Sequence, residues 1–569
     1  MAMTENVEAT EADALPQAPP EEPSPPAPAP ILTAGSGAAG NDHKIVASQY
    51  LVAAIVFLLV GGVLALLMRA QLAQPDGTLL SDREYRSLFT FHGTYSVFLF
   101  LLPAWIAVAT AIVPLQIGAG RLAFPRLQVL ALWLYYSGGA LVTAAAFFTG
   151  GRRLVSGWSF TDPVPDGAAF RGEALEFLVV GIALVLVGAV LASANLLTTI
   201  LKFRAPGLTM RRLPLFTWSV LVSGIVLLLA APVLIGGMGM LYVDHHFGAH
   251  LFSGFTSARG GNPEIWPRLF WFGAYPFLFA LLLPALGAAS DILPVFAKRP
   301  IADRAKAMPA FAAIGVLAFF GWGSEVANLE GAKLLFIAGA LVVLAPIASL
   351  VVNWLLTLRA ADPDDLKSGM TSAPMLHVLG FVAVVAAGLA TSAVSAADAT
   401  GDLHGNYWHV GQQHLMFFAP ATIAFAAALH FWGPKWWGRH LSAGLGKLEV
   451  LLITGGSLLA FLPALVLGLQ DMPVHTSTYS SGDGWGALSL IMGVGGAALV
   501  LGVLVLVLNL LFSVAFKRGK PAIADPWEGH TLEWAAPSPP PRHNFDRVPE
   551  VRSATPMLDL VTGATGASD

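Results

Sequence analysis

The chain contains no cysteine, and only 12% of its 569 residues are charged. Without cysteine the chain cannot form disulfides, hold iron–sulfur clusters, attach c-type haem covalently or build a copper site on thiolates. Any metal bound by this chain must therefore be held by histidine, carboxylate or methionine side chains. The low charge is also informative, because a soluble globular protein carries about 25% charged residues.

Long apolar runs take the place of the missing charge, and 56% of the residues are hydrophobic. A run of about 20 apolar residues is long enough to span a bilayer, and in lipid its backbone groups must bond internally. The sequence therefore predicts an all-α polytopic membrane protein, a bundle of twelve transmembrane helices. The expected spans are 47–68, 92–118, 127–149, 175–200, 215–241, 266–287, 308–328, 334–357, 375–395, 407–432, 448–468 and 486–514.

The two ends of the chain differ from this membrane domain, which we expect to cover 43–518. Residues 1–42 are rich in Pro, Ala and Glu and contain no Lys or Arg, which predicts a disordered tail. This segment resembles neither a signal peptide nor a mitochondrial presequence, which favours a bacterial plasma membrane. Residues 519–569 are expected to form a second tail. The sequence has no basic stripe of the kind that would indicate nucleic acid as a partner. The expected surroundings are therefore lipid and other membrane proteins.

The charged loops predict the orientation of the bundle. With the N-terminus inside, the inner loops hold about 19 Lys and Arg residues, against about 8 in the outer loops. Cytoplasmic loops carry such an excess of positive charge. Both termini are therefore expected to be cytoplasmic.

Several motifs occur in an order that resembles one known family. They are MRAQLAQPDG at 68–77, HGTYSVFLFLLP at 92–103, PLQIGAGRLAFPRLQ at 114–128, FWFGAYPFLFALLLPALG at 270–287, HFWGPKWWGR at 430–439 and DPWEGHTLEWAAPSPPPRHNF at 525–545. Together they look like subunit I of the A-type haem–copper oxidases, the catalytic subunit of cytochrome c oxidase. The resemblance spans about 45–550 and implies the twelve-helix fold of that subunit.

The resemblance implies a low-spin haem held by two axial histidines, whose positions fall on His92 and His414. Arg69 matches the arginine that donates to this haem in the family. Both histidines are expected in the outer half of the bilayer at compatible depths, because their helices run in the same direction. Neutral imidazoles suit iron, and polar groups buried in lipid are functional candidates. The haem type, a or b, is left open.

The oxygen-reducing centre of the family, a high-spin haem beside copper, is not matched. The resemblance places Tyr275 and Ser324-Glu325 where the family has copper-binding histidines, and Gln412 where it has the proximal haem histidine. Phe279 replaces the family's tyrosine. Proton-route and propionate positions are changed as well, at Phe277, Arg121, Leu350, Ile347, Val474 and His475. We therefore expect no copper and no second haem, with aromatic side chains such as Phe277 and Phe279 filling the space.

Some residues leave alternatives open. Glu325 is an intramembrane carboxylate, and it is either a proton site, an iron ligand as in the nitric oxide reductases that resemble this fold, or a protonated residue without a role. Gln412 and Tyr275 have oxygen atoms that can ligate a metal. Replacement histidine ligands can come from His409, His430, His245 and His246. His404 matches a magnesium ligand of the family, but its acidic neighbour has become Gly405.

Three functions are compatible with this pattern. The chain is expected to be an electron-transfer subunit of a respiratory complex with one haem, together with subunit II-like and subunit III-like partners that the family implies. The alternatives are a non-catalytic scaffold with structural or no haem, and an active terminal oxidase with an atypical site. Cofactor stoichiometry separates them, as one haem, none, or two with copper.

Overall fold

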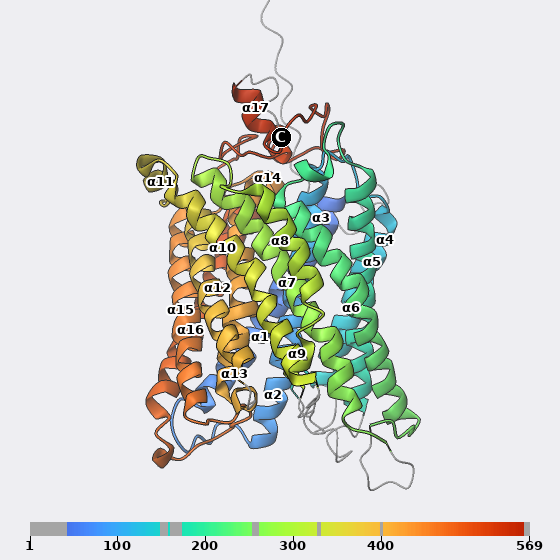
Figure 1. Ribbon diagram of the computed structural model, residues 1–569, viewed down its shortest axis with the longest axis vertical. Coiled ribbons are helices and arrows are strands. Elements are labelled where there is room, and N and C mark those ends of the chain that lie inside the picture. The colour runs from blue at the N-terminus through green and yellow to red at the C-terminus, as the bar shows by residue number, and fades with distance from the viewer. Residues whose placement is uncertain are drawn as a thin grey trace, which may run out of the picture.

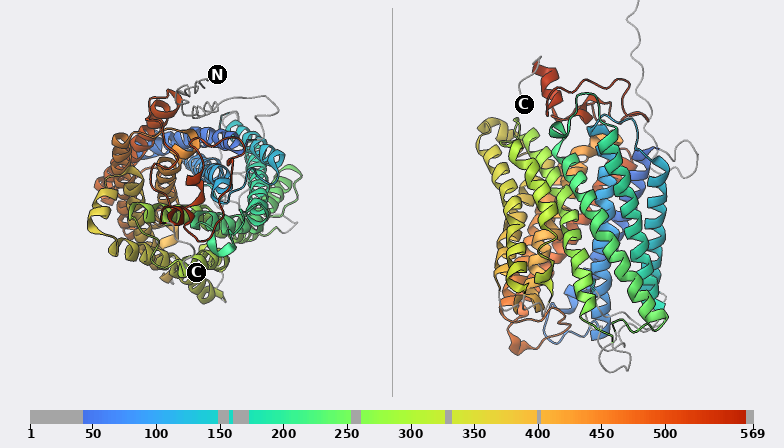
Figure 2. Two further views of the ribbon diagram at one scale, coloured as in Figure 1. Left: turned by 90° about the horizontal axis from the view of Figure 1, so that it is seen from above. Right: turned by 45° about the vertical axis from the view of Figure 1, so that its right-hand side comes forward.

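The apolar runs fold into long helices that stand side by side in one bundle (Figure 1). The computed structural model describes residues 42–147, 157–159, 173–252, 261–326, 332–398 and 402–562. Seen from above, the helices surround the middle of the molecule, and the C-terminal tail lies across one end (Figure 2). The predicted N-terminal tail lies outside the described residues except for Asp42, which caps the first helix by accepting a hydrogen bond from the Lys44 backbone.

The helices follow the predicted spans closely. They are α1 (His43–Gln71), α2 (Asp82–Thr94) continuing through the π-helix η2 (Tyr95–Leu101) into α3 (Leu102–Gln116), α4 (Pro125–Phe147), α5 (Glu173–Lys202), α6 (Leu215–His246), α7 (Ile265–Phe296), α8 (Arg304–Leu317), α9 (Lys333–Val342), α10 (Leu344–Arg359), α11 (Pro363–Gly369), α12 (Ala373–Ala397), α13 (Tyr407–Gln413) continuing through the π-helix η8 (His414–Phe418) into α14 (Ala419–Trp437), α15 (Ala443–Leu469), α16 (Gly486–Leu510) and α17 (Pro556–Thr562).

Among the described residues, eleven helices are long and apolar enough to cross a membrane. The remaining expected span, 308–328, coincides with α8, which ends at Leu317 and leads through turns into the 3-10 helix η5 (Trp322–Glu325). Gly321 and Gly323 explain the break. A Cβ atom added to them would lie 2.5 Å from the Tyr275 ring and 2.3 Å from the Phe336 ring. These glycines permit a close approach that a regular helix with larger side chains would prevent.

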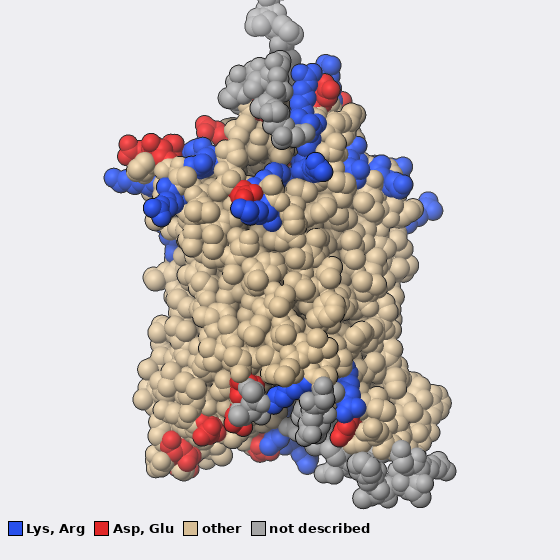
Figure 3. All heavy atoms as spheres, in the orientation of Figure 1, with Lys and Arg blue, Asp and Glu red and all other residues tan. Residues whose placement is uncertain are grey.

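The outer surface matches a bilayer. On the face seen in Figure 3 a broad band without charged side chains crosses the bundle, and charged residues gather at its two ends. In this view Lys and Arg are most frequent at the end that carries the C-terminal tail. Apolar side chains are exposed within the band, as for Leu451 (68% exposed) on α15 and Leu229 (58%) on α6. Lipid is the solvent in which such exposure costs nothing.

Three membrane segments form the centre of the bundle. In the most apolar part of the segments Asp82–Gln116, Ile265–Phe296 and Tyr407–Trp437, the buried share of residues is 94%, 89% and 89%, against 22% in His43–Gln71. Polar side chains on these three segments therefore face protein or an internal cavity rather than lipid. The positions that the resemblance singles out at His92, Tyr275, Gln412 and His414 lie on these three segments.

The C-terminal tail packs against the ends of the inner helices. The buried Glu533 carboxylate accepts hydrogen bonds from Gln116 Nε2 (3.1 Å) and Trp432 Nε1 (2.9 Å). Burial raises the pKa of this carboxyl above its ordinary value. The Asn544 side chain donates to the Ala119 carbonyl at 2.7 Å. The tail is thus part of the folded bundle at this end.

Candidate cofactor site

Two histidines on the central segments lie where each helix changes its winding. His92 is near the end of α2, three residues before the π-helix η2 begins, and His414 is the first residue of the π-helix η8. A capping box at Ser81 and Glu84 fixes the start of α2. Single π-helical turns inside α-helices are often found at functional sites, because the wider turn changes the direction of the side chains.

The imidazole rings of His92 and His414 face each other across a gap. Their centroids are 6.5 Å apart and their planes are inclined by only 4°. The Nδ1 atom of His92 lies 2.9 Å from the Gly61 carbonyl, and that of His414 lies 2.7 Å from the Val410 carbonyl. Each Nδ1–H therefore donates to the backbone, which leaves the Nε2 lone pair of each ring free to bind a metal.

The spacing of the two rings suits one metal ion between them. Metal–imidazole bonds are about 2.0 Å long, so two axial imidazoles have centroids roughly 6 Å apart once the radius of each ring is added. The observed 6.5 Å is close to this value. A direct stacking contact would be shorter, as between His414 and Phe461, whose centroids are 4.2 Å apart.

The two histidines line a cavity of about 350 Å³, within the size range of about 300–1,000 Å³ that is typical of ligand sites. Its wall is mostly apolar and includes Phe100, Val97, Phe418 and Phe461. The cavity thus has the space and the lining of a site for a large, flat, apolar ligand.

Arg69, at the end of α1, is the charged group nearest this pair among the residues identified from the sequence. It lines the same cavity, and its guanidinium donates to the Tyr407 hydroxyl at 3.2 Å and contacts Met492 Sδ at 3.9 Å. In the described part of the chain no carboxylate forms an ion pair with Arg69. A partly buried cation without an ion-pair partner among the described residues favours an anionic ligand group in the cavity.

The region around Gln412 and Tyr275 is packed differently. The Gln412 side chain donates from Nε2 to Ser392 Oγ at 2.7 Å. The Phe279 ring lies 5.4 Å from Tyr275 and 5.0 Å from Phe417 between centroids. The cavity that remains among these side chains is about 30 Å³, room for about one water molecule. Aromatic packing at Phe279 agrees with what the sequence predicts for this region.

The other candidate ligands lie elsewhere, with one exception. His245 and His246 are at the end of α6 and pair with Glu176, and His430 donates to or accepts from Glu449 at 2.7 Å. None of these three histidines lines the cavity that contains His92 and His414. The exception is Glu325, which the structure brings close to His404 and His409. The sequence alone did not place His404 and His409 beside Glu325.

Comparison with known proteins agrees with this architecture. Residues 45–498 match the family described as cytochrome c and quinol oxidase polypeptide I. The chain is 35% identical over 525 residues to the "Probable cytochrome c oxidase subunit 1-alpha" of Streptomyces avermitilis, covering 91% of this chain and 88% of that one. It is 34% identical over 521 residues to the "Cytochrome c oxidase subunit 1" of Bacillus subtilis, covering 91% and 81%.

Further similar proteins include a quinol oxidase subunit and a solved structure. The "Quinol oxidase subunit 1" of Bacillus subtilis is 33% identical over 525 residues, with 91% of this chain and 79% of that one covered. A solved structure of a haem–copper terminal oxidase dimer has the same fold, with a TM-score of 0.70 at 16% identity over 93% of this chain and 90% of that one. On its sequence and its fold, the chain belongs to the cytochrome c and quinol oxidase polypeptide I family and is a membrane protein of the cytochrome c oxidase subunit I type.

Proposed function

We propose that the chain is an electron-transfer subunit of a respiratory membrane complex that binds one low-spin haem between His92 and His414 and lacks the oxygen-reducing haem–copper centre. The observation that carries the proposal is the geometry of the two imidazoles. They are parallel, 6.5 Å apart, and each is fixed by an Nδ1 hydrogen bond to a backbone carbonyl. Such second hydrogen bonds orient imidazole ligands and raise their basicity.

The residues of the large cavity fit a haem. The Nε2 atoms of His92 and His414 would hold the iron, and the apolar wall of the cavity suits the macrocycle. Arg69 provides a positive charge for the propionates or another polar substituent of the ring. When bound, the haem supplies a one-electron redox couple. Because two protein imidazoles would hold the iron, this site suits electron transfer rather than oxygen chemistry.

The residues of the small cavity do not fit the second centre of the family. A high-spin haem needs a proximal ligand, but the Gln412 amide is engaged with Ser392. A copper ion needs several imidazoles, whereas the corresponding side chains are Tyr275, Ser324 and Glu325. The remaining space of about 30 Å³ is too small for a macrocycle. We therefore derive no oxygen-reducing step for this chain.

The surroundings of the subunit follow from the same proposal. Relatives named as cytochrome c oxidase and quinol oxidase subunits support a place in a multi-subunit complex, with subunit II-like and subunit III-like partners. The gathering of Lys and Arg at the end with the C-terminal tail supports cytoplasmic termini (Figure 3). The membrane is proposed to be a bacterial plasma membrane.

The proposal is tested by the haem content of the purified chain, measured per polypeptide with the optical spectrum of the reduced state. The expected result is one low-spin haem per chain. A chain that folds without haem would instead support the scaffold function. Two haems with copper would restore the terminal oxidase and contradict the proposal.

A further inference from the structure

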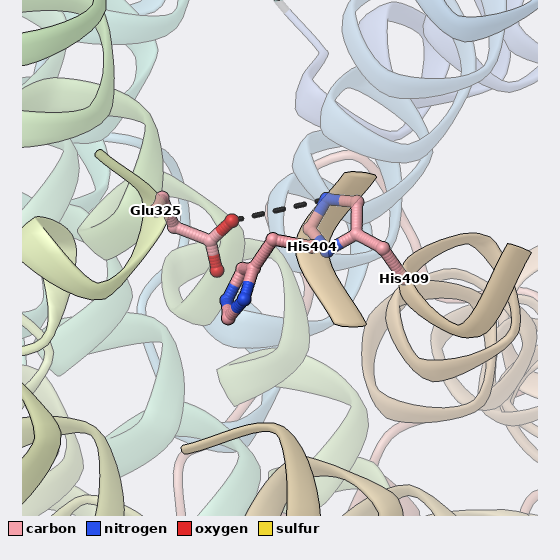
Figure 4. Close-up of side chains that lie close together, drawn as sticks. All are labelled: Glu325, His404 and His409. Carbon is pink, nitrogen blue, oxygen red and sulfur yellow. Dashed lines mark ion pairs between the residues drawn. The ribbon is translucent and has the colours of Figure 1, made fainter. Parts of the chain in front are cut away.

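Three side chains from separate parts of the sequence meet at one end of the large cavity. Glu325 comes from η5, His404 from the 3-10 helix η7 (Asp402–Gly405) and His409 from α13. One ligand atom of each lies within 4.8 Å of the others, and His409 Nε2 is 3.8 Å from a Glu325 carboxylate oxygen. The carboxylate points toward the two imidazoles, which approach it from the opposite side (Figure 4).

These three side chains are close to one another but are not joined by hydrogen bonds. The distance of 3.8 Å between His409 and Glu325 is too long for one. The imidazoles of His404 and His409 are 5.6 Å apart between centroids, at an angle of 38°. By contrast, the other histidine–carboxylate cluster in the described part of the chain is closed by a bond of 2.7 Å between His430 and Glu449. The ligand atoms of the first cluster are not bonded to one another, so all three can bind an ion. In the second cluster the bond between His430 and Glu449 is already made, and His377 Nε2 lies 3.9 Å from the same carboxylate without a hydrogen-bond partner among the described residues.

The cluster is accessible from the interior of the protein. All three residues line the large cavity, and Glu325 and His404 also line the small one. The His409 side chain is 18% exposed and the Glu325 side chain 12% exposed. A hydrated ion can therefore reach the three ligand atoms, and a water molecule has room to complete a coordination shell.

Neighbouring hydrogen bonds fix the backbone that carries these ligands. The Asn406 side chain accepts from Trp408 N at 2.9 Å and donates to the Asp402 carbonyl at 2.9 Å, so it ties η7 to the first turn of α13. The Ser324 hydroxyl donates to the Gly321 carbonyl at 2.7 Å, beside Glu325. Such outer contacts, which hold the ligand-bearing segments in place, are typical of metal sites.

We propose that Glu325, His404 and His409 form a binding site for a divalent transition-metal ion of the zinc or iron type. Two imidazoles and one carboxylate are a donor set for these metals, whereas Mg²⁺ and Ca²⁺ prefer oxygen ligands throughout. The set offers three protein ligands and leaves a position open to water. This site is distinct from the His92–His414 pair and does not rest on the proposed electron-transfer function.

Binding would require a small closure of the site. A tetrahedral ion with bonds of about 2.0–2.2 Å holds its ligand atoms roughly 3.4 Å apart. The present separations, up to 4.8 Å, come within this range after rotation about side-chain torsions. Glu325 is joined to its helix neighbours by a short 3-10 turn, and its side chain is free of other hydrogen bonds among the described residues, so this rotation breaks no existing bond.

The test measures Zn²⁺ binding by the full chain. The protein is purified in detergent, treated with a chelator, dialysed against Zn²⁺ and analysed for metal per chain. We expect one tightly held Zn²⁺, and X-ray absorption at the zinc edge should show two imidazoles with oxygen ligands. Since haem contains no zinc, this measurement gives an answer whether or not the proposed haem is present. The variants Glu325→Gln and His409→Ala should each weaken binding by at least about tenfold.

Two variants serve as matched controls. His475→Ala changes a histidine that lines the same cavity but lies outside the cluster, and His377→Gln changes the other histidine–carboxylate cluster. Both should still bind one Zn²⁺. The isosteric Glu325→Gln keeps the shape of the side chain, and its elution in size-exclusion chromatography should match the parent chain. The proposal is overturned if the parent chain retains no Zn²⁺, or if Glu325→Gln and His409→Ala bind it as tightly as the controls.

Discussion

His414 and Gln412 lie two residues apart on the same central segment, yet their surroundings differ in almost every respect. The His414 ring faces His92 across a cavity of about 350 Å³, with Nε2 unoccupied. The Gln412 amide is bonded to Ser392 and borders a cavity of about 30 Å³. A histidine and a large cavity therefore occur together at one position, and a glutamine and a small cavity occur together at the other.

In our proposal the second centre is absent, and this difference then indicates how the fold tolerates that loss. Replacing a ligand histidine alone would leave a large apolar void, and voids are costly because the surrounding side chains lose their contacts. In the second region the Phe279 ring contacts both Tyr275 and Phe417, and these contacts fill the space. The bundle keeps its helices because the interior is filled, by side chains on one side and, in our account, by haem on the other.

The largest expected effect comes from removing an imidazole of the facing pair. His92→Ala or His414→Ala should abolish the low-spin haem spectrum, because the low-spin state requires both imidazole ligands. Haem per chain and the reduced optical spectrum measure this. His409→Ala, which lines the same cavity, should keep the haem while losing Zn²⁺ affinity. Retention of a normal low-spin spectrum in both His92→Ala and His414→Ala would contradict the proposed role of these two histidines as haem ligands.

A second prediction concerns the packed region. Phe279 is 1% exposed, so Phe279→Ala should destabilise the protein by about 3–5 kcal/mol through the cavity that it creates. Thermal unfolding in detergent, followed by tryptophan fluorescence, measures the loss. Phe147→Ala is the matched control, since Phe147 is 71% exposed and should change stability little. Equal stability of the two variants would mean that the space around Phe279 is not tightly packed.

A smaller effect is expected at Arg69. The positive guanidinium beside the cavity favours the reduced state of a bound haem, because reduction adds a negative charge. Arg69→Gln should therefore lower the midpoint potential by about 60 mV, which corresponds to about a tenfold change in a one-electron equilibrium. A redox titration followed by optical absorption measures the shift. An unchanged potential would place the haem away from Arg69.

The smallest change is expected from restoring a single ligand in the packed region. Gln412→His returns an imidazole to this position, but the cavity of about 30 Å³ has no room for a macrocycle. The haem content should stay at one per chain. A second haem in this variant would show that lost ligands alone, and not packing, determine the cofactor content.

Much of the fold could be predicted from the sequence, because lipid imposes a strong and local pattern. Runs of about 20 apolar residues mark spans wherever they occur, and the helices follow them. The region 308–328 was harder to predict, since its apolar composition does not reveal that α8 ends at Leu317. Gly321 and Gly323 are the only local signs of the break, and their close contacts with Tyr275 and Phe336 are visible only in three dimensions.

The candidate sites were predictable to different degrees. His92, His414 and Arg69 came from the family resemblance, and the structure brings all three to one cavity. The meeting of Glu325 with His404 and His409 was missed, because residues so far apart in sequence are brought together by packing alone. One signal was present in the sequence. Glu325 and His409 stand at the outer ends of their predicted spans, and His404 lies in the outer loop just before the span of His409, so all three are expected at a similar depth.

The central claim is that the chain holds a haem whose two axial positions are both occupied by protein, with no second haem that is open to ligands. Carbon monoxide binds only to a haem iron with an open position, so it tests this claim directly. The difference spectrum of the reduced protein with and without carbon monoxide should be flat, at one haem per chain. A carbon monoxide adduct in the parent chain would contradict the account and indicate an oxygen-reactive centre with unfamiliar ligands.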